Sequence, residues 1–210
     1  MIKIENEVTS GWEAAIRGMR NPMNSWDKLD SEFYETVFRI GENDLDLMKR
    51  LAVAGSDHRK FMRMIMASCD ITAPLYWWKE YDTYKVGTVA NSCSTMHKIH
   101  ANEFTLDDFS HEHLMNGYDE FDSLEALQHT IRSLNVCRTK YLETKEKMWW
   151  WQMIQLLPSS YNQRRTVMLN YEVLRNIYRA RKNHKLDEWR DFCKWIETLP
   201  YSELITGISK

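Results

Sequence analysis

Arginine side chains supply the most suggestive chemistry in this sequence, because a guanidinium can stabilise negative charge on a bound group. They gather around one predicted helix, at Arg164, Arg165, Arg175, Arg179 and Arg181. Arg175 and Arg179 are spaced with Lys182 along one helix face that we expect to be exposed, where they need no function. Arg181 falls at the helix end, where the dipole alone favours a cation. Spacing by itself therefore leaves their function open.

Four histidines fall within a short stretch, a density that metal sites sometimes show. They are His97, His100, His111 and His113. Their spacing matches neither HExxH nor a zinc finger, and Glu112 between the last two adds no ligand motif. We interpret them as solvated loop histidines and expect no metal site.

Cys93 is a candidate nucleophile, because Ser92 and Ser94 flank it and His97 lies nearby in the sequence. An ordinary small loop residue is the favoured interpretation, since such short motifs often occur by chance. The sequence contains no GxGxxG, no GxxxxGK[ST] and no GxSxG pattern. It therefore signals neither a Rossmann fingerprint, nor a P-loop, nor a hydrolase nucleophile elbow.

Composition narrows the class of protein. The chain has 210 residues, 28 Lys plus Arg against 30 Asp plus Glu, and a net charge of −2, which argues against a nucleic-acid polymer as partner. No stretch approaches the roughly 20 apolar residues of a membrane span, so we expect no membrane partner. The N-terminus lacks an apolar signal core, and the four cysteines form no CxxC pair. We expect a reduced, cytoplasmic protein, with three cysteines buried and Cys93 in a polar loop.

Hydrophobic periodicity predicts the elements that must position these residues. Helices, or a strand-to-helix transition in the first case, are expected at 9–20, 44–54 with Asn43 as cap, 74–82 with Pro74 in the first turn, 123–141 with Ser123 as cap, 149–157, 170–181 and 187–198. Strands are expected at 61–71 and 166–169, and a polar loop at 83–100. The total is an α+β protein with helix in excess.

The order of several short blocks carries more information than any one of them. Leu157-Pro158 is followed by Asn170, Leu174, Asn176, Ala180-Arg181, His184 and Glu188-Trp189. This series resembles the C-terminal signature of the flavin-dependent thymidylate synthases. Three earlier blocks agree in order: 15–20 looks like the family's Arg-x-x-Arg segment, 55–61 with His58 like its Gly-His loop, and 73–75 like the start of its signature helix. The resemblance spans roughly residues 13–197.

The resemblance implies a single domain over residues 1–210, with a central antiparallel or mixed sheet packed with long helices. It implies FAD as cofactor and the methylation of dUMP, or a related pyrimidine deoxynucleotide, to dTMP. Methylenetetrahydrofolate would be the carbon donor and NADPH would reduce the flavin. The family needs no enzyme nucleophile, because reduced flavin supplies a hydride. Four subunits build the sites jointly in this family, so a homotetramer is expected.

Site residues are likewise implied by the resemblance. Arg181 would contact the uracil and stabilise negative charge as its C5 becomes nucleophilic. The flavin is expected at His58, Thr83, Tyr84, Lys85, Asn170 and Asn176. The nucleotide is expected at Glu80, Asn91, Ser92, Cys93 and Ser94 together with Arg181, and the segment from Asn91 to Ser94 would offer donors to its phosphate.

Departures from the family pattern fall on charged positions. Thr83-Tyr84-Lys85 replaces an Arg-His-Arg triplet, Ser92 replaces a Glu, and Met96, Ile154 and Glu172 each replace an Arg. Each lost charge-assisted contact to a phosphate would weaken binding by about 1.5–3 kcal/mol. The sequence therefore predicts a divergent member of the family.

Two aromatic runs stand out. Trp77-Trp78 could stack on ligand rings or simply be buried at an interface. Trp149, Trp150 and Trp151 are predicted to form part of a buried subunit interface, because one helix cannot hide three consecutive large rings on one face.

Two further hypotheses remain open. The fold could be kept in a flavin- or nucleotide-binding protein with altered or lost catalysis. Alternatively, the chain could be a non-enzymatic helical interaction protein whose motif order is accidental, which predicts no affinity for flavin or nucleotide.

Overall fold

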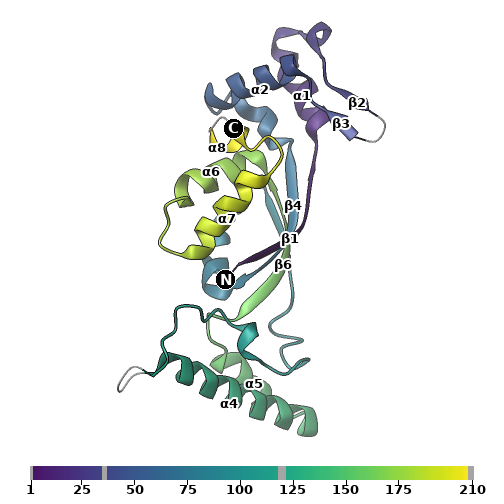
Figure 1. The fold of residues 1–210 in the computed structure, drawn as a ribbon. Coiled ribbons are helices and arrows are strands. Elements are labelled where there is room, and N and C mark those ends of the chain that lie inside the picture. Colours follow the sequence, from purple (N-terminus) through teal and green to yellow (C-terminus); the bar gives the residue numbers. More distant parts are fainter. Residues whose placement is uncertain (1, 35–36, 118–121, 208–210) are drawn as a thin grey trace. The chain divides into compact units, whose positions relative to one another are not determined.

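The computed structural model describes residues 2–34, 37–117 and 122–207. The chain forms two compact units. Unit 1 takes residues up to 3, 72–82 and 91–165, and unit 2 takes residues 4–71, 83–90 and those from 166 onward. The predicted α+β class is confirmed (Figure 1).

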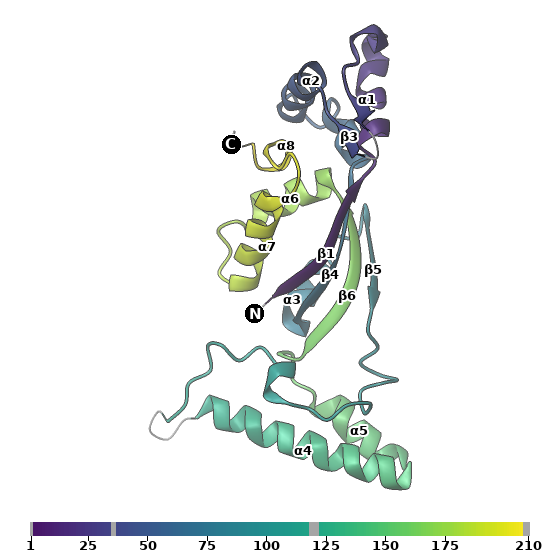
Figure 2. The same cartoon turned by 45° about the vertical axis from the view of Figure 1, so that its right-hand side comes forward.

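Four strands form an antiparallel sheet in the order β1-β4-β6-β5 (Figure 2). Their bounds are β1 Lys3–Ser10, β4 Met66–Pro74, β5 Thr88–Ser92 and β6 Asn162–Asn170. Burial alternates along β4, as expected for a strand with one face against a core. At one end of the β4–β6 pair the Leu75 N–H donates to Tyr161 O, and at the other the Tyr171 N–H donates to Ile65 O.

The described part of unit 1 contains the helices α3, α4 and α5, and the last two pack around a small apolar core. Their bounds are α3 Leu75–Tyr81, α4 Ser123–Thr144 and α5 Lys147–Leu156, with a short 3-10 turn, η4, at Leu106–Asp108. Helices α4 and α5 lie side by side (Figures 1 and 2). Leu127, Ile131 and Leu134 recur on one face of α4 and pack with Met153 of α5. Ile99, Phe104 and Phe109 from the preceding segment complete this core. The helical spacing in the sequence therefore predicted the α4 face correctly.

Unit 2 contains the remaining helices and a hairpin. The helices are α1 Trp12–Arg20, α2 Glu42–Val53, α6 Tyr171–Arg181, α7 Asp187–Thr198 and α8 Glu203–Thr206. The hairpin pairs β2 Glu32–Tyr34 with β3 Val37–Arg39, and 3-10 turns lie at η1 Asn21–Met23, η2 Trp26–Lys28 and η3 Arg59–Arg63. Leu174, Ile177 and Trp189 from α6 and α7 are fully buried. The predicted helix at 187–198 is confirmed at both ends.

Several sequence-based boundaries are wrong, and long-range pairing explains most of them. Residues 88–92 form the edge strand β5 rather than a loop, and β6 is longer than the predicted 166–169. The segment 61–71 divides into the turn η3 and the strand β4. Helix α4 is capped by Asp122, whose side chain accepts from the Glu125 N–H, and not by Ser123. Strand pairing adds hydrogen bonds that local propensity does not encode.

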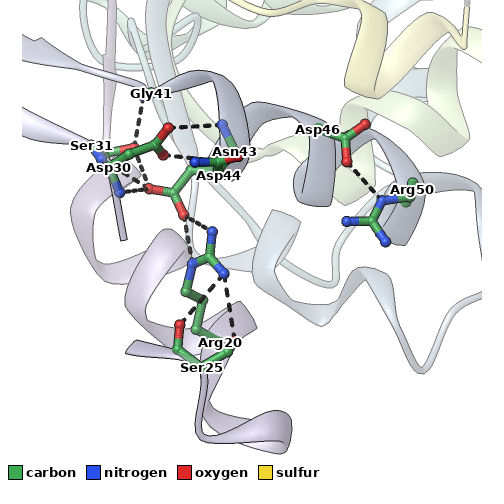
Figure 3. Close-up of polar contacts among 9 residues, drawn as sticks. All are labelled: Arg20, Ser25, Asp30, Ser31, Gly41, Asn43, Asp44, Asp46 and Arg50. Atoms are coloured by element: carbon green, nitrogen blue, oxygen red, sulfur yellow. Dashed lines mark hydrogen bonds and ion pairs between the residues drawn. The ribbon is translucent and has the colours of Figure 1, made fainter. Parts of the chain in front are cut away.

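The N-terminus of α2 shows how a distant residue can replace a local cap. Asn43 was predicted to cap this helix, but α2 begins at Glu42. The Asp30 carboxylate, thirteen residues earlier, accepts hydrogen bonds from the backbone N–H groups of Asn43 (2.8 Å) and Asp44 (3.0 Å) (Figure 3). These are two of the donors that a helix start leaves unpaired. Asp30 therefore supplies the cap.

Asp44 is fully buried and forms the centre of a polar network (Figure 3). Its carboxylate accepts from Arg20 Nε at 2.7 Å and from Ser31 Oγ at 2.7 Å, and also from the backbone N–H groups of Asp30 and Ser31. Burial alone would raise the pKa of Asp44, but the hydrogen bonds from Ser31 and Arg20 outweigh burial and hold it below its ordinary value. The network ties α1 to α2.

Among the described residues, no helix is both long and apolar enough to cross a membrane.

Candidate functional site

The start of α6 is fixed by Asn170, the last residue of β6. Asn170 is only 8% exposed, and its side-chain oxygen accepts a hydrogen bond of 2.9 Å from the Val173 N–H. Asparagine is a favoured cap because it satisfies a donor that the first helical turn leaves free. Asn170 was expected at the flavin, and its structural role here is that of a helix cap.

A hollow of about 340 Å³ opens beside this helix start. It is lined by Arg63, Val86, Gly87, Asn170, Glu172, Val173 and Asn176. The structure thus brings together Asn170 and Asn176, two of the predicted flavin residues. Gly87 has φ +77°, and a Cβ there would lie 2.6 Å from the Asn170 side-chain nitrogen. Glycine therefore keeps the hollow open at this point.

Glu172 contacts two arginines of η3. Arg59 Nε donates to its carboxylate at 3.2 Å, and Arg63 Nε donates to the other oxygen at short range. Burial alone would raise the pKa of Glu172, but the hydrogen bonds from Arg63 and Arg59 hold it below its ordinary value. Two cations against one carboxylate leave one positive charge in excess. Arg63, whose side chain is 53% exposed, presents its part of that charge to the hollow.

Arg181 lies at the opposite end of α6 and is held by aromatic residues. Its Nε donates to the Tyr84 hydroxyl at 3.0 Å, and its guanidinium lies 4.8 Å from the ring centroid of Trp189. The Trp189 ring is fully buried and contacts the Tyr84 ring edge-on, with centroids 6.0 Å apart. His184 Nε2 lies 3.0 Å from an Arg181 nitrogen. Two predicted site residues, Tyr84 and Arg181, are thus in direct contact.

Arg175 corrects one expectation. It was predicted to lie on an exposed face of the helix with Arg179 and Lys182, but it is only 3% exposed. One guanidinium nitrogen donates to the carbonyl oxygens of Leu204 (2.8 Å) and Ile205 (3.2 Å). Burial lowers the pKa of Arg175, and the nearby Arg179 lowers it further. Arg175 joins α6 to α8 and is unavailable to a ligand.

The other predicted flavin residues lie on the surface, away from the hollow beside α6. His58, Thr83 and Lys85 are exposed. His58 precedes η3, the turn that carries Arg59 and Arg63, and its backbone N–H donates to Gly55 O. None of these three residues lines the hollow beside α6.

The predicted nucleotide residues other than Arg181 lie in unit 1. Asn91 and Ser92 end the edge strand β5, and both are exposed. Cys93 is also exposed, as predicted, and its backbone is fixed by Arg164 O and the Gln163 side chain. The Ser94 hydroxyl accepts from the N–H groups of Met96 and His97. Glu80 lies half-buried on α3.

Trp77 and Trp78 belong to the core of the chain itself, which supports neither ligand stacking nor burial at an interface. Both are at most 1% exposed. Trp78 Nε1 donates to Gln163 O at 2.9 Å, and the Arg165 guanidinium lies 4.2 Å from its ring centroid. Buried rings of this kind cannot stack on a ligand.

Three cysteines are shielded from solvent: Cys69 and Cys193 are buried and Cys137 is half-buried. Burial raises the pKa of Cys69 and of Cys193 to about 12.

Sequence reasoning missed four residues that shape the two ends of α6: Arg59, Arg63, Gly87 and the ring of Trp189. The arginine spacing of four in 59–63 was a usable signal, but the segment from 61 was assigned to a strand. Among the described residues, no group of three or more His, Cys, Asp or Glu side chains is arranged to hold a metal ion.

Comparison with solved structures gives full-length matches. One is thymidylate synthase X (ThyX) from Helicobacter pylori, solved with FAD and dUMP, with a TM-score of 0.71 at 14% identity over 98% of this chain and 97% of that one. A second structure of the flavin-dependent thymidylate synthase ThyX from Helicobacter pylori, complexed with FAD and dUMP, gives 0.69 at 14% identity, covering 97% of each chain. This chain has the flavin-dependent thymidylate synthase fold.

The same fold occurs in a UMP/dUMP methylase, PolB from Streptomyces cacaoi, solved with 5-bromo-dUMP. The TM-score is 0.63 at 13% identity, over 99% of this chain and 96% of that one. No protein-family model and no curated protein matches the sequence. The thymidylate synthase fold is thus kept at an identity too low for sequence comparison, which agrees with the predicted divergence.

Proposed function

We propose that this chain is a divergent flavin-dependent thymidylate synthase that methylates dUMP, or a related pyrimidine deoxynucleotide, to the 5-methyl product. Methylenetetrahydrofolate would provide the carbon and NADPH would reduce the flavin. The carbon would bond to C5 of the pyrimidine as its bond to tetrahydrofolate breaks, the C5 proton would leave, and the methyl group would gain its third hydrogen as a hydride from the reduced flavin.

The observation that carries this proposal is the support of Arg181. Tyr84 and Trp189 hold the guanidinium by a hydrogen bond and by a ring face, so its direction is set before any ligand arrives. A pre-oriented cation stabilises negative charge that develops on a pyrimidine ring without a cost of reorganisation. Arg181 would thus orient the uracil and favour electron density at C5.

The hollow at the start of α6 could hold one part of a flavin cofactor. Gly87 leaves room that a Cβ would fill, the amides of Asn170 and Asn176 offer polar groups, and Arg63 brings a cation for a diphosphate. Flavin would supply the hydride that no side chain of this protein can supply. The chain's own residues would bind, orient and screen the reactants.

A second candidate function is flavin or nucleotide binding with altered or lost catalysis. Glu172 favours it, because this carboxylate occupies a position where the family resemblance implies an arginine, and it consumes part of the charge of Arg59 and Arg63. A weaker grip on phosphates would result, although Arg63 still faces the hollow.

The deciding experiment uses the purified protein, FAD and dUMP. We expect flavin absorption bands that shift when dUMP is added, and dTMP formation when methylenetetrahydrofolate and NADPH follow. Arg181→Ala should reduce turnover about 100-fold or more while FAD still binds. Arg179→Ala, on an exposed part of the same helix, is the matched control and should retain activity.

Three outcomes separate the candidates. Turnover that survives Arg181→Ala contradicts the role given to Arg181. Flavin and nucleotide binding without turnover favours the second candidate. A protein that binds neither ligand contradicts both.

Assembly and setting are part of the same proposal. We infer a homotetramer in the cytoplasm, with units 1 and 2 acting as one domain, because each of the four sheet strands has residues in both units. Trp151 supports an interface, since 43% of this large apolar residue is exposed in the single chain. Sedimentation velocity would test the tetramer, and Trp151→Ser should weaken it.

A further inference from the structure

A second hollow, of about 300 Å³, lies in unit 1 beside the turn between α4 and α5. Its lining is Met96, His97, His100, Tyr141, Lys145, Lys147 and Trp150. Four of these seven side chains are lysines or histidines, and none is acidic. Neither the proposed reaction nor the sequence resemblance gives any of those four residues a role.

The two lysines are not neutralised by the protein. Among the described residues neither Lys145 nor Lys147 forms an ion pair, and their ammonium groups lie 5.8 Å and 5.7 Å from the ring centroids of Tyr141 and Trp151. Other lysines of the chain do find acids, such as Lys140 with Glu143 and Lys194 with Asp191. The hollow therefore collects positive charge that the fold leaves uncompensated.

The start of α5 adds to this charge. Lys147 is the first residue of this ten-residue helix, which has no acidic residue in its first turn, and its N-cap residue Glu146 makes no side-chain cap hydrogen bond. A helix start carries partial positive charge and free N–H groups, so a lysine there is unfavourable unless an anion is bound. Lys145, at the end of α4, is favoured by that helix dipole, but the same cannot be said of Lys147.

His100 responds to the same field. Burial lowers its pKa, and the cations of Lys145 and Lys98 lower it further. Its ring contacts the Tyr141 ring edge-on, with centroids 4.8 Å apart, and the Arg138 guanidinium donates to its backbone carbonyl rather than to an acid. Mutual repulsion among these groups would be relieved by one anion in the hollow.

Aromatic walls indicate what the anion is attached to. Tyr141 and Trp150 line the hollow, and Trp150 is anchored because its Nε1 donates to Met96 O at 2.9 Å. A ring face beside cations suits a planar ring that bears a phosphate. A hollow of this size is at the lower end of small-molecule sites.

We propose that this hollow binds the phosphate group of a nucleotide-like phosphomonoester, with Lys145 and Lys147 as the principal cations and Tyr141 and Trp150 beside the ring. The inference goes beyond the proposed function, because it assigns a phosphate site to residues that the proposed reaction does not use and it requires no flavin; only its dUMP alternative rests on the proposed function. The phosphate could belong to the nucleotide that is methylated or to another phosphorylated metabolite.

The test is calorimetric titration of the full chain with inorganic phosphate, with dUMP and with deoxyuridine, at low salt. We expect phosphate and dUMP to bind and deoxyuridine to bind much more weakly. The double variant Lys145→Gln/Lys147→Gln should weaken phosphate binding about tenfold or more, because each lysine contributes a charge-assisted contact. Lys140→Gln/Lys194→Gln removes the same charge from ion-paired lysines and should change binding less than about twofold.

Equal losses in the two double variants would overturn the proposal, since only net charge would then matter. Unchanged binding in Lys145→Gln/Lys147→Gln, or no saturable phosphate binding in the wild type, would also overturn it. Displacement of phosphate by dUMP identifies the methylated nucleotide as the source. Phosphate binding that persists beside saturating dUMP identifies another phosphomonoester. FAD absorption, measured in parallel, tests the proposed function separately, because none of the four lysines lines the hollow beside α6.

Discussion

Asp44 and Glu172, two buried carboxylates of unit 2, accept hydrogen bonds from arginines and differ in how their charge is balanced. Asp44 meets one arginine, Arg20, and the pair is 0% and 4% exposed. Glu172 meets two arginines, Arg59 and Arg63, and the second of these is 53% exposed. The Asp44–Arg20 pair is closed and electrically balanced, whereas the contacts of Glu172 keep a positive charge beside a hollow.

This difference distinguishes a structural network from one that can serve a ligand. A buried balanced pair contributes specificity, and removal of one partner leaves an unpaired charge in the core. A network with excess charge at the edge of a hollow contributes less to stability, and one of its arginines can leave the carboxylate to bind a ligand anion. The two networks should therefore respond differently to the same kind of substitution.

The largest effect is expected from breaking the closed network. Arg20→Ala should lower the free energy of unfolding by about 3–5 kcal/mol, because Asp44 is left charged and buried. Urea unfolding measures this change. Arg50→Ala is the control, since Arg50 pairs with Asp46 on the surface of α2, the helix that carries Asp44 (Figure 3). This substitution should lower the free energy of unfolding by about 0.5 kcal/mol or less. Similar losses in the two variants would contradict the contrast.

A smaller effect is expected from Glu172→Gln. Unfolding should become easier by about 1–2 kcal/mol, because the contacts to Arg59 and the half-exposed Arg63 are weakened. FAD binding should become tighter or stay the same, since both guanidinium groups are released from a carboxylate. Urea unfolding and flavin titration give the two readouts. Loss of FAD binding in a folded Glu172→Gln protein would show that the carboxylate itself is needed.

The smallest effect is expected in the pH dependence. The pKa values of Asp44 and Glu172 are both held below their ordinary values of 3.8 and 4.5. The stabilisation from each is complete above that ordinary value and is lost as the pH falls through the lowered one. Stability should therefore drop in acid, and Glu172→Gln should reduce the slope by up to about 1.4 kcal/mol per pH unit. Urea unfolding at several acidic pH values measures how the free energy of unfolding changes with pH. The same pH dependence in Glu172→Gln and in the wild type would contradict the lowered pKa of Glu172.

Local sequence patterns predicted elements wherever the chain folds against its immediate neighbours. The amphipathic spacing of Leu127, Ile131 and Leu134 and the helix at 187–198 are confirmed. Local patterns gave wrong predictions where the residue or strand that a segment contacts lies far along the chain. Asn43 has the side chain of a helix cap, but the Asp30 carboxylate caps the helix instead. The short segment of β5 carries no strand pattern of its own, and it forms a strand because β6 pairs with it.

The candidate site divides in the same way. The order of motifs identified Arg181, Tyr84, Asn170 and Asn176 as related, and the structure joins the first two by a hydrogen bond and the last two across one hollow. It could not identify Arg59 and Arg63 as the partners of Glu172, because that contact spans more than a hundred residues. It also placed Arg175 on the surface.

The sequence by itself determined the α+β class, the helical faces and the similarity in motif order to flavin-dependent thymidylate synthases. These depend on side-chain periodicity and on residue type, both of which are local. Only the tertiary structure decided which charges are balanced, which tryptophans are buried and which lysines are left without an acid. Those properties depend on distances between segments that are remote in the chain, and Coulomb and burial energies follow distance in space rather than order in sequence.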